Sequence, residues 1–311
     1  MIKKGPKVSA IILVYHNEKF LKNCVLSMRQ SAKIANVDLE IIVVVNDTKL
    51  EKSGFLVPKN CTIIFNKKNL GFGKSINKAS IVANGDWLLI ANLDTIAISD
   101  TLKILLTHVD DEKIGIIAPK VINPNGSLQF SILDRPTLWN IFKEQTYIYR
   151  LFPSVFHSTQ VDKKIYEYFH EVDLVSGAYF LIKRDVFNRI GGFDERFFIY
   201  FEDFDLCKRV RKFGYKIIFE SRTKITHFGH QSNQGIVIGS IYIESLYKYL
   251  RKYYSSNYAL LGISLVALGS FFRLIYWFFR TKFTFSEDIK DFGRKKIVYC
   301  REVLKSYPKF L

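Results

Sequence analysis

The residues best suited to chemistry lie in one acidic and aromatic run, from Gly191 to Leu206. Charged side chains are rarely placed among apolar groups without a partner or a task. A Gly pair opens the run, and apolar residues at helical spacing follow Asp203. We therefore predict a loop that brings an acidic pair, Glu202 and Asp203, to a helix N-terminus, where the helix dipole favours negative charge. The alternative is an ordinary capped helix whose acids are solvated.

Elements that could position this pair are visible upstream. Apolar strands at 8–15, 39–45, 61–65 and 87–91 alternate with helices at 20–31, 75–83 and 102–109. This alternation predicts an α/β domain with a mostly parallel, Rossmann-like sheet that helices cover on both faces. Ligands of such sheets bind at the carboxyl ends of the strands. Four polar segments stand at those ends and are expected to line one site: Tyr15-His16-Asn17, Asn46-Asp47-Thr48, Asn69-Leu70-Gly71 and Asn92-Leu93-Asp94.

Two residues, Asp94 and His227, have side chains that could bind a cation. Asp94 follows a buried strand, and a divalent cation that bridges a diphosphate needs one or two such oxygen ligands from protein. An Asx-turn or helix cap is the simpler reading of the same motif. His227, beyond a later strand, is either a second ligand or a core histidine, with His230 as the competing ligand.

Only one member of the acidic pair can face a reacting hydroxyl, because adjacent side chains on a turn or helix point in different directions. Asp203 is predicted as the general base, which must lie within hydrogen-bond reach of the proton it takes. Glu202 is predicted to orient an acceptor or a loop. In the alternative, both acids form ion pairs with Arg196, Arg209 or Lys208.

Composition limits the class of protein. The chain has 311 residues, 48% of them hydrophobic, and a formal charge of +17. This supports a sizeable core and suits nucleic acid, anionic lipid or a phosphate-bearing substrate. The four Cys residues form no CxxC pair, which favours a reducing compartment. The first apolar run, 8–14, is too short for a signal peptide, so a cytoplasmic location is expected.

The second half of the chain is less regular. Strands are expected at 114–121, 172–182 and 215–219, an aromatic and basic helix at 241–254, and loops or short helices over 131–171. Residues 258–279 carry a single charge, Arg273, and are long enough to span a membrane, which takes ~20 residues. Three readings stay open: a helix or hairpin in the membrane interface, a full span with Arg273 snorkelling, or a buried helix pair. Lys and Arg over 282–309 favour anionic lipid.

The order of these motifs resembles a known family. They run Val14-Tyr15-His16-Asn17, Val45-Asn46-Asp47, Asn69-Leu70-Gly71-Phe72-Gly73, Asn92-Leu93-Asp94-Thr95, Ser176-Gly177-Ala178, Gly191-Gly192-Phe193-Asp194-Glu195, Glu202-Asp203-Phe204-Asp205 and His227. Over residues 7–255 the chain is similar to family 2 glycosyltransferases with the A-type nucleotide-diphospho-sugar transferase fold. The rhamnosyltransferase-like enzymes of bacterial surface polysaccharide synthesis are the branch it resembles.

The resemblance implies roles for individual residues. It assigns donor binding to Tyr15, Asn17, Asp47, Asn69, Gly71, Asn92, Asp94 and Gly177. It implies Mg²⁺ or Mn²⁺ held by Asp94 and His227, Asp203 as the base with Glu202 beside it, and inversion at the anomeric carbon. Leu93 and the neutral Asn92 depart from the family's more acidic metal motif, which implies modest metal affinity.

The resemblance also implies a division of labour. Residues 1–255 would form the catalytic domain, with a nucleotide-binding half (1–110) and an acceptor and catalytic half (111–255), and 256–311 would be membrane-associating helices. The expected partners are a dTDP-, UDP- or GDP-linked sugar, a glycan or lipid-linked glycan acceptor and an anionic membrane surface, with no nucleic acid and a homodimer left open. The expected location is the inner face of the bacterial cell membrane. The alternatives are a nucleotidyltransferase of similar fold and a non-catalytic basic module that binds membrane or nucleic acid.

Overall fold

The chain divides into two compact units. The computed structural model describes residues 6–47, 49–50, 56–152, 154–156, 158–159, 162–229 and 238–311, so Thr48 and His230 lie outside the described residues. The first unit takes in 1–134, 162–195 and 202–234. The second takes in 135–161, 196–201 and 235–311.

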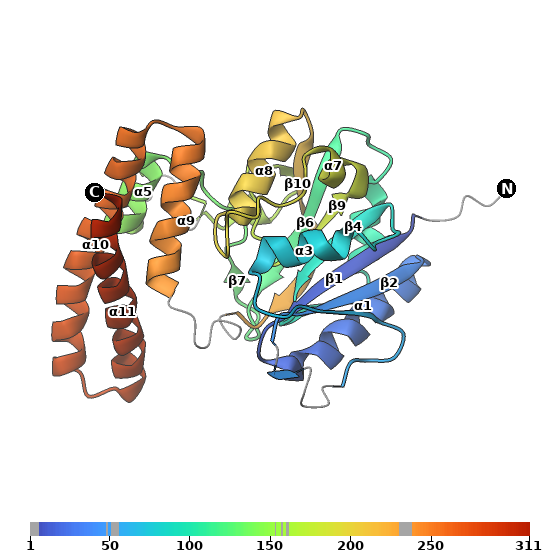
Figure 1. The fold of residues 1–311 in the computed structure, drawn as a ribbon, viewed down its shortest axis with the longest axis horizontal. Helices are drawn as coiled ribbons and strands as arrows, with labels where there is room; N and C mark the ends of the chain where they lie inside the picture. Colours follow the sequence, from blue (N-terminus) through green and yellow to red (C-terminus); the bar gives the residue numbers. More distant parts are fainter. Residues whose placement is uncertain are drawn as a thin grey trace. The chain divides into compact units, whose positions relative to one another are not determined.

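The first unit is built on a mixed sheet with the order β3-β2-β1-β4-β9-β6-β10-β5 (Figure 1). Its strands are β1 (Val8–Val14), β2 (Leu39–Val45), β3 (Thr62–Phe65), β4 (Trp87–Asn92), β5 (Thr95–Ala97), β6 (Ile114–Ile122), β7 (Leu128–Gln129), β8 (His170–Glu171), β9 (Tyr179–Lys183) and β10 (Lys216–His227). Strands β3, β2, β1 and β4 are parallel to one another, as the alternation of elements predicts. Strand β9 is antiparallel to both β4 and β6, which makes the sheet mixed.

Helices cover both faces of this sheet because its central strands are apolar on both sides. One core cluster joins Ala10 and Ile12 of β1 to residues of α1 (Leu21–Ala35) and α4 (Thr101–Leu105). The other joins Ile11 to α3 (Phe72–Ser80), α7 (Arg184–Arg189) and α8 (Glu202–Lys212). Short 3-10 turns lie at Glu18–Phe20, Leu106–His108 and Lys164–Tyr166.

The strand expected over 172–182 is wrong in its first part. Strand β9 begins only at Tyr179. Upstream, Val175 forms a single bridge with Ile132, and the Gly177 N–H donates to the side chain of Asp203 instead of to a neighbouring strand. A backbone donor bound to a side chain cannot also extend the ladder, so the strand stops short of the site.

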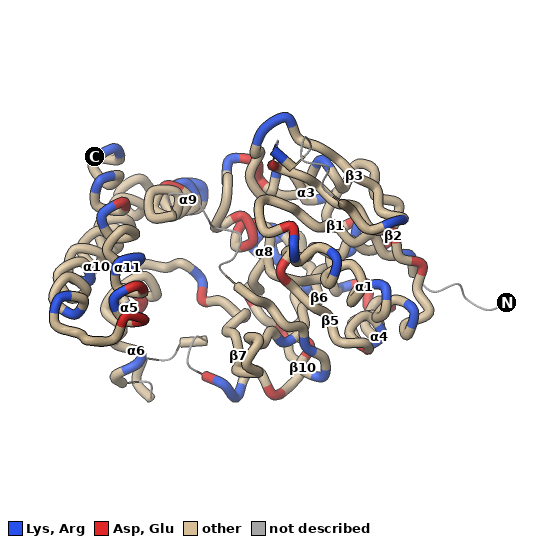
Figure 2. Tube along the Cα trace, turned by 90° about the horizontal axis from the view of Figure 1, so that it is seen from below, with Lys and Arg blue, Asp and Glu red and all other residues tan. Residues whose placement is uncertain are grey.

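The second unit is helical. It contains α5 (Leu138–Thr146), α6 (Ile148–Leu151), α9 (Ile238–Tyr253), α10 (Ser256–Phe283), α11 (Glu287–Ser306) and a final 3-10 turn (Tyr307–Phe310). Helix α10 packs against α5, α9 and α11, and Lys and Arg recur along α9, α10 and α11 (Figure 2). Helix α10 is also the one described helix that is long and apolar enough to cross a membrane.

Arg273 does not reach toward solvent as a snorkelling residue would. Its guanidinium donates to the Gln145 side chain and to the Tyr147 hydroxyl, and its Nε donates to the Gly269 carbonyl at 3.2 Å. Gln145 lies on α5, so the one charge in this apolar segment ties α10 to α5. The second unit thus supplies Arg273 with polar partners that the sequence does not show, while snorkelling in a full span stays a prediction.

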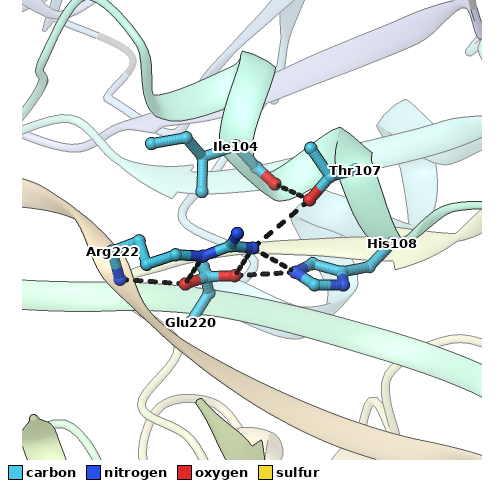
Figure 3. Close-up of polar contacts among 5 residues, drawn as sticks. All are labelled: Ile104, Thr107, His108, Glu220 and Arg222. Atoms are coloured by element: carbon cyan, nitrogen blue, oxygen red, sulfur yellow. Dashed lines mark hydrogen bonds and ion pairs between the residues drawn. The ribbon is translucent and has the colours of Figure 1, made fainter. Parts of the chain in front are cut away.

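An ionic cluster around the buried Glu220 lies in the middle of β10 (Figure 3). The Glu220 side chain has no exposed surface, and its Oε2 lies 2.6 Å from His108 Nε2 and 2.7 Å from Arg222 Nη2. Its Oε1 accepts from the Arg222 backbone N–H at 2.8 Å and from Arg222 Nε at 3.0 Å. The pairing of β10 with β6 shifts register between Glu220 and Lys224, so the cluster lies where the ladder is irregular.

We expect Glu220→Gln to lower the free energy of unfolding by about 1–3 kcal/mol, since charge-assisted hydrogen bonds become neutral ones. Burial alone would raise the pKa of Glu220, but hydrogen bonds from Arg222 and His108 outweigh it and leave the pKa below its ordinary value. The stabilisation is therefore complete above the unfolded pKa of about 4.3 and is lost as the pH falls through the lower folded value.

Urea unfolding of both proteins at several pH values measures this difference. Glu112→Gln, at an exposed position, is the matched control and should change little. A difference between native protein and Glu220→Gln that grows on acidification would contradict the prediction.

Candidate active site

The acidic pair stands at the start of α8, as predicted. The residues before it, Tyr200 and Phe201, have positive φ angles of 70° and 65°, a conformation uncommon for non-glycine residues. Asp203 Oδ2 accepts from the Gly177 N–H at 3.0 Å, and Oδ1 accepts from the Phe204 N–H at 2.9 Å. Hydrogen bonds to both oxygens favour the ionised carboxylate. The side chain is half-buried, so it is held in place without being sealed from a ligand.

Glu202 has a different environment. It is buried, and its Oε2 has no hydrogen-bond partner among the described residues. Burial, and next the charge of Asp203, raise the pKa of Glu202 well above its ordinary value. Burial also raises the pKa of Asp203, but the Gly177 and Phe204 N–H groups oppose that rise. Of the two adjacent acids, Asp203 thus has the hydrogen-bond donors that favour the charged form, and the pKa of Glu202 is raised by both burial and the charge of Asp203.

The predicted alternative, in which arginine pairs with both acids, does not hold for Arg209. Arg209 Nε donates to Asp205 Oδ2 at 2.7 Å, and Arg209 Nη1 donates to the Ile190 carbonyl at 2.7 Å. Asp205 is fully buried. Arg209 thus connects α8 to the chain before the Gly-Gly turn, which is a structural role. Asp203 accepts its hydrogen bonds from backbone N–H groups instead.

Helix α3 fixes the turn that precedes the acids. Asn77 Oδ1 accepts from the Phe193 N–H and Asn77 Nδ2 donates to the Phe193 carbonyl, both at 2.8 Å. Gly192 has a φ of 65°, and a Cβ there would lie 2.5 Å from Asn77 Oδ1. Only glycine fits this position, because any side chain would be strained and would push Asn77 away. Lys74, also on α3, forms a 2.7 Å ion pair with Glu195.

Asp94 and His227, which are 133 positions apart in the sequence, lie side by side in the structure. His227 is the last residue of β10, and its Nε2 lies 3.2 Å from Asp94 Oδ1 and 3.4 Å from Asn92 Nδ2. The Phe228 N–H donates to the Asp94 carbonyl at 2.9 Å, which ties the two segments together. Asp94 is buried, and its Oδ2 has no hydrogen-bond partner among the described residues.

Gln129 orients the imidazole of His227. Gln129 Oε1 lies 2.6 Å from His227 Nδ1, while Gln129 Nε2 donates to Asn123 Oδ1 at 3.0 Å. Since the Gln129 amide nitrogen donates to Asn123, the amide oxygen faces His227 and accepts from Nδ1–H, while Nε2 is the ring nitrogen that lies 3.2 Å from Asp94. Outer partners of this kind are typical of histidines that bind metal.

These atoms fit a divalent cation. Asp94 Oδ2 has no hydrogen-bond partner among the described residues, and His227 Nε2 lies 3.2 Å from the other oxygen of the same carboxylate, so the two side chains could bind one cation. Within the described ranges, no group of three or more His, Cys, Asp and Glu could hold a metal ion. Protein would thus supply two ligands, and the remainder would come from water and a diphosphate, as is usual for Mg²⁺.

The segment Ser176-Gly177-Ala178 connects the two chemical groups. The Gly177 N–H donates to Asp203, and the Ala178 carbonyl accepts from the Asn92 N–H at 2.8 Å. A Cβ at Gly177 would lie 3.5 Å from Asp203 Oδ2, which is an ordinary van der Waals contact. Adjacent residues of this segment therefore bond Asp203 and Asn92, and Asn92 lies two residues before Asp94.

A second cluster lies at the ends of β1 and β2. His16 Nδ1 is 2.8 Å from Asp47 Oδ2, and the Tyr15 and His16 rings lie 4.2 Å apart. His16 and Asn17 both have left-handed backbone angles, with φ of 58° and 56°. Strained backbone at a ligand-facing edge is frequent in binding sites. The structure thus gathers Tyr15, Asn17 and Asp47 at one edge of the sheet.

Buried amides shape the loop after β3. Asn46 Nδ2 donates to Asn69 Oδ1 at 3.0 Å and to the Gly71 carbonyl at 3.1 Å, and Asn69 Oδ1 also accepts from the Gly71 N–H at 2.9 Å. Asn66 and Ser75 both donate to Asn46 Oδ1. The Asn69 oxygen therefore organises the loop, and Gly71, with a φ of 81°, starts α3 beside it.

Sequence reasoning missed several of these residues. They are Asn66, Ser75, Asn77, Asn123 and Gln129. Asn46 was predicted to line the site as part of a polar strand end, so its position carried a usable signal. Gln129 carries no such signal, because 98 residues separate it from His227 and its own strand has two residues.

The fold and the site together define a class of protein. Residues 6–238 match the family described as Glycosyltransferase like family 2, and the chain belongs to this family. Solved structures with the same A-type fold include GalNAc-T7 with UDP, GalNAc and Mn²⁺ (TM-score 0.57, 15% identity, 80% of this chain and 48% of that chain). They also include the mannosyltransferase PcManGT from Pyrobaculum calidifontis with GDP-Man and Mn²⁺ (TM-score 0.55, 14% identity, 99% of this chain and 88% of that one).

Curated relatives place the chain with the rhamnosyltransferase-like branch. N-acetylglucosaminyl-diphospho-decaprenol L-rhamnosyltransferase of Mycobacterium tuberculosis (strain ATCC 25618 / H37Rv) is 26% identical over 189 residues, which are 51% of this chain and 56% of the relative. Rhamnosyltransferase WbbL of Escherichia coli (strain K12) is 24% identical over 180 residues, 56% of this chain and 66% of the relative. Both matches leave more than a third of the relative uncovered.

Proposed function

We propose that this chain is an inverting, metal-assisted glycosyltransferase, in which residues 1–255 form the catalytic domain. It would transfer a hexose, with rhamnose as the first donor sugar to test, from a dTDP-, UDP- or GDP-linked donor to a lipid-linked or nascent surface polysaccharide. The observation that carries the proposal is that Gly177 donates to Asp203 while the next residue, Ala178, accepts from Asn92, which lies two residues before the Asp94 that contacts His227.

Asp203 takes the proton of the acceptor hydroxyl as its oxygen attacks the anomeric carbon. The bond from that carbon to the diphosphate breaks as the new glycosidic bond forms, so one displacement inverts the centre. No enzyme nucleophile is needed, unlike the paired carboxylates of retaining glycosidases. Asp94 and His227 would hold Mg²⁺ or Mn²⁺, which supplies charge neutralisation for the departing diphosphate.

The other strand ends would bind the donor. Asp47, held by His16, accepts hydrogen bonds from the pyrimidine base or another base edge, and Tyr15 and Asn17 line the same pocket. Asn69, Gly71, Asn92 and Gly177 lie along the ribose, diphosphate and sugar. The acceptor chemistry and the basic, apolar helices of 256–311 support a peripheral location on the inner face of a bacterial cell membrane.

A panel of nucleotide sugars tests this proposal. We expect one donor, with Mg²⁺ or Mn²⁺ present, to raise the Tm and to be hydrolysed slowly without acceptor. Ligand at 100 times its Kd adds about 2.7 kcal/mol to the free energy of unfolding, which thermal unfolding detects readily. If no donor raises the Tm or is hydrolysed with either ion, the proposed function is wrong.

A further inference from the structure

Helix α10 has two apolar faces, and only one of them is packed. The packed face consists of Ala259, Gly262, Ile263, Val266, Ala267 and Ser270, all buried. The other face includes Phe271, Phe272, Ile275, Phe278, Phe279 and Phe283, each at least 41% exposed. With about 100° of rotation per residue, these six cover an arc of roughly 140° that lies opposite the packed face. A surface helix of a water-soluble unit would carry polar residues there.

The turn between α10 and α11 continues this face. Phe285 is 100% exposed and Phe283 is 72% exposed, and they lie where the two helices meet. Figure 1 shows this turn extending past the first residues of α9, so it forms the free end of the helical hairpin. Exposed apolar side chains that lie next to one another on a helix and its following turn are typical of an interaction site.

Basic groups accompany the aromatic rings. The Arg280 guanidinium lies 6.0 Å from the Tyr276 ring centre, Lys282 Nζ lies 5.8 Å from that of Phe283, and Lys296 Nζ lies 5.1 Å from that of Phe292. Long basic side chains can place their stems beside buried rings while their charged ends reach phosphate headgroups. By the same rotation of about 100° per residue, Lys282 lies within the apolar arc and Arg280 roughly 60° beyond its edge. Basic side chains beside exposed rings are typical of an interfacial helix on anionic lipid.

A second copy of this chain fits the face less well. Symmetric dimers use the same patch on both partners, so Arg280 and Lys282 of one copy would approach those of the other. A full membrane span also fits poorly, since α11 packs along α10 and carries ten Asp, Glu, Lys and Arg residues between Glu287 and Ser306. The described residues thus favour a bilayer that α10 enters from one side.

We propose that the free face of α10 and the turn at Phe283 and Phe285 insert into the surface of an anionic bilayer. The hairpin is then a monotopic anchor. The packed face of α10 keeps its contacts with the other helices of the second unit, while Arg280, Lys282 and Lys296 contact the lipid headgroups. This inference rests on the proposed function only for its purpose, which is to bring the enzyme to a lipid-linked acceptor.

Vesicle flotation of the full chain tests the anchor. Vesicles of phosphatidylcholine are compared with vesicles of equal parts phosphatidylcholine and phosphatidylglycerol. We expect the native protein to float with the anionic vesicles, and the triple variant Phe279→Ser, Phe283→Ser, Phe285→Ser to bind at least about tenfold more weakly. The variant Arg280→Gln, Lys282→Gln should lose about fivefold per charge on anionic vesicles only.

The matched control replaces exposed apolar residues of the first unit, Ile81→Ser and Phe213→Ser, which are 82% and 50% exposed. It should bind vesicles like the native protein. Equal vesicle binding by the native protein and the triple Phe variant, or a dimer that this variant abolishes without any vesicle binding, would overturn the proposal. Donor-induced Tm shifts on the same samples report the active site separately, so a failed anchor and a failed donor site give different results.

Discussion

Replacing Asp203 by asparagine is expected to lower kcat for sugar transfer by about 10²–10⁴-fold while donor binding persists. Asparagine keeps the shape of the side chain but cannot accept the acceptor's proton. Its amide group would also meet the Gly177 and Phe204 N–H groups, which now donate to a carboxylate. Steady-state transfer assays together with donor titration calorimetry separate the loss of chemistry from the loss of binding.

Glu202→Gln is the matched control, because a buried acid with a strongly raised pKa is already close to a neutral amide in charge. We expect this variant to keep most of its turnover. If Glu202→Gln abolishes transfer and Asp203→Asn does not, the assignment of the base is reversed. Near-normal turnover in both variants would remove the acidic pair from the mechanism.

The pH dependence of the native enzyme follows from the same geometry. Burial raises the pKa of Asp203 above its ordinary value. A general base must be deprotonated, so kcat/KM should fall as the pH drops through that raised pKa, at a higher pH than an exposed aspartate would give. An acidic limb at the ordinary aspartate value would contradict this reading of the site.

Asp94→Asn is expected to weaken metal-dependent donor binding by roughly 100-fold or more. The substitution removes the carboxylate whose Oδ1 lies 3.2 Å from His227 Nε2, and an amide group of similar size takes its place. Titration of the donor with Mn²⁺, with Mg²⁺ and with EDTA measures the effect, and Mn²⁺ binding by the protein alone gives a second readout.

Asp86→Asn is the control for that experiment. Asp86 lies just before β4, at the opposite end of the same strand, and is exposed. It should bind donor like the native protein in every condition. Donor affinity of the native protein that EDTA leaves unchanged would rule out the proposed role of Asp94 and His227 as metal ligands.

Local sequence was sufficient for the elements that carry the site. The apolar runs at Val8–Val14, Leu39–Val45 and Trp87–Asn92 are strands, and polar residues follow each of them at the expected edge. Parallel strands buried on both faces must be apolar throughout, so their ends are visible as abrupt changes of polarity. The acidic pair at the start of α8 was visible for a similar reason, since a break in apolar spacing marks a helix end.

Long-range pairing was not visible in the same way. Strand β9 enters the sheet antiparallel between β4 and β6, and no local pattern specifies the direction of a partner strand. The orientation of His227 by Gln129, and the tie between Asn77 and Phe193, join residues 98 and 116 positions apart. Arg273 shows the same limit, because its partners Gln145 and Tyr147 lie more than 120 residues away in the sequence.

The sequence by itself therefore determined which residue types stand at the strand ends and that an acidic pair begins a helix. Tertiary structure decided the surroundings of the two acids. The Gly177 N–H, from a segment 26 residues away, donates to Asp203 Oδ2, while Glu202 is buried and its Oε2 has no hydrogen-bond partner among the described residues. Hydrogen bonds to a carboxylate favour its charged form and burial disfavours it, so folding gives two adjacent acids different environments.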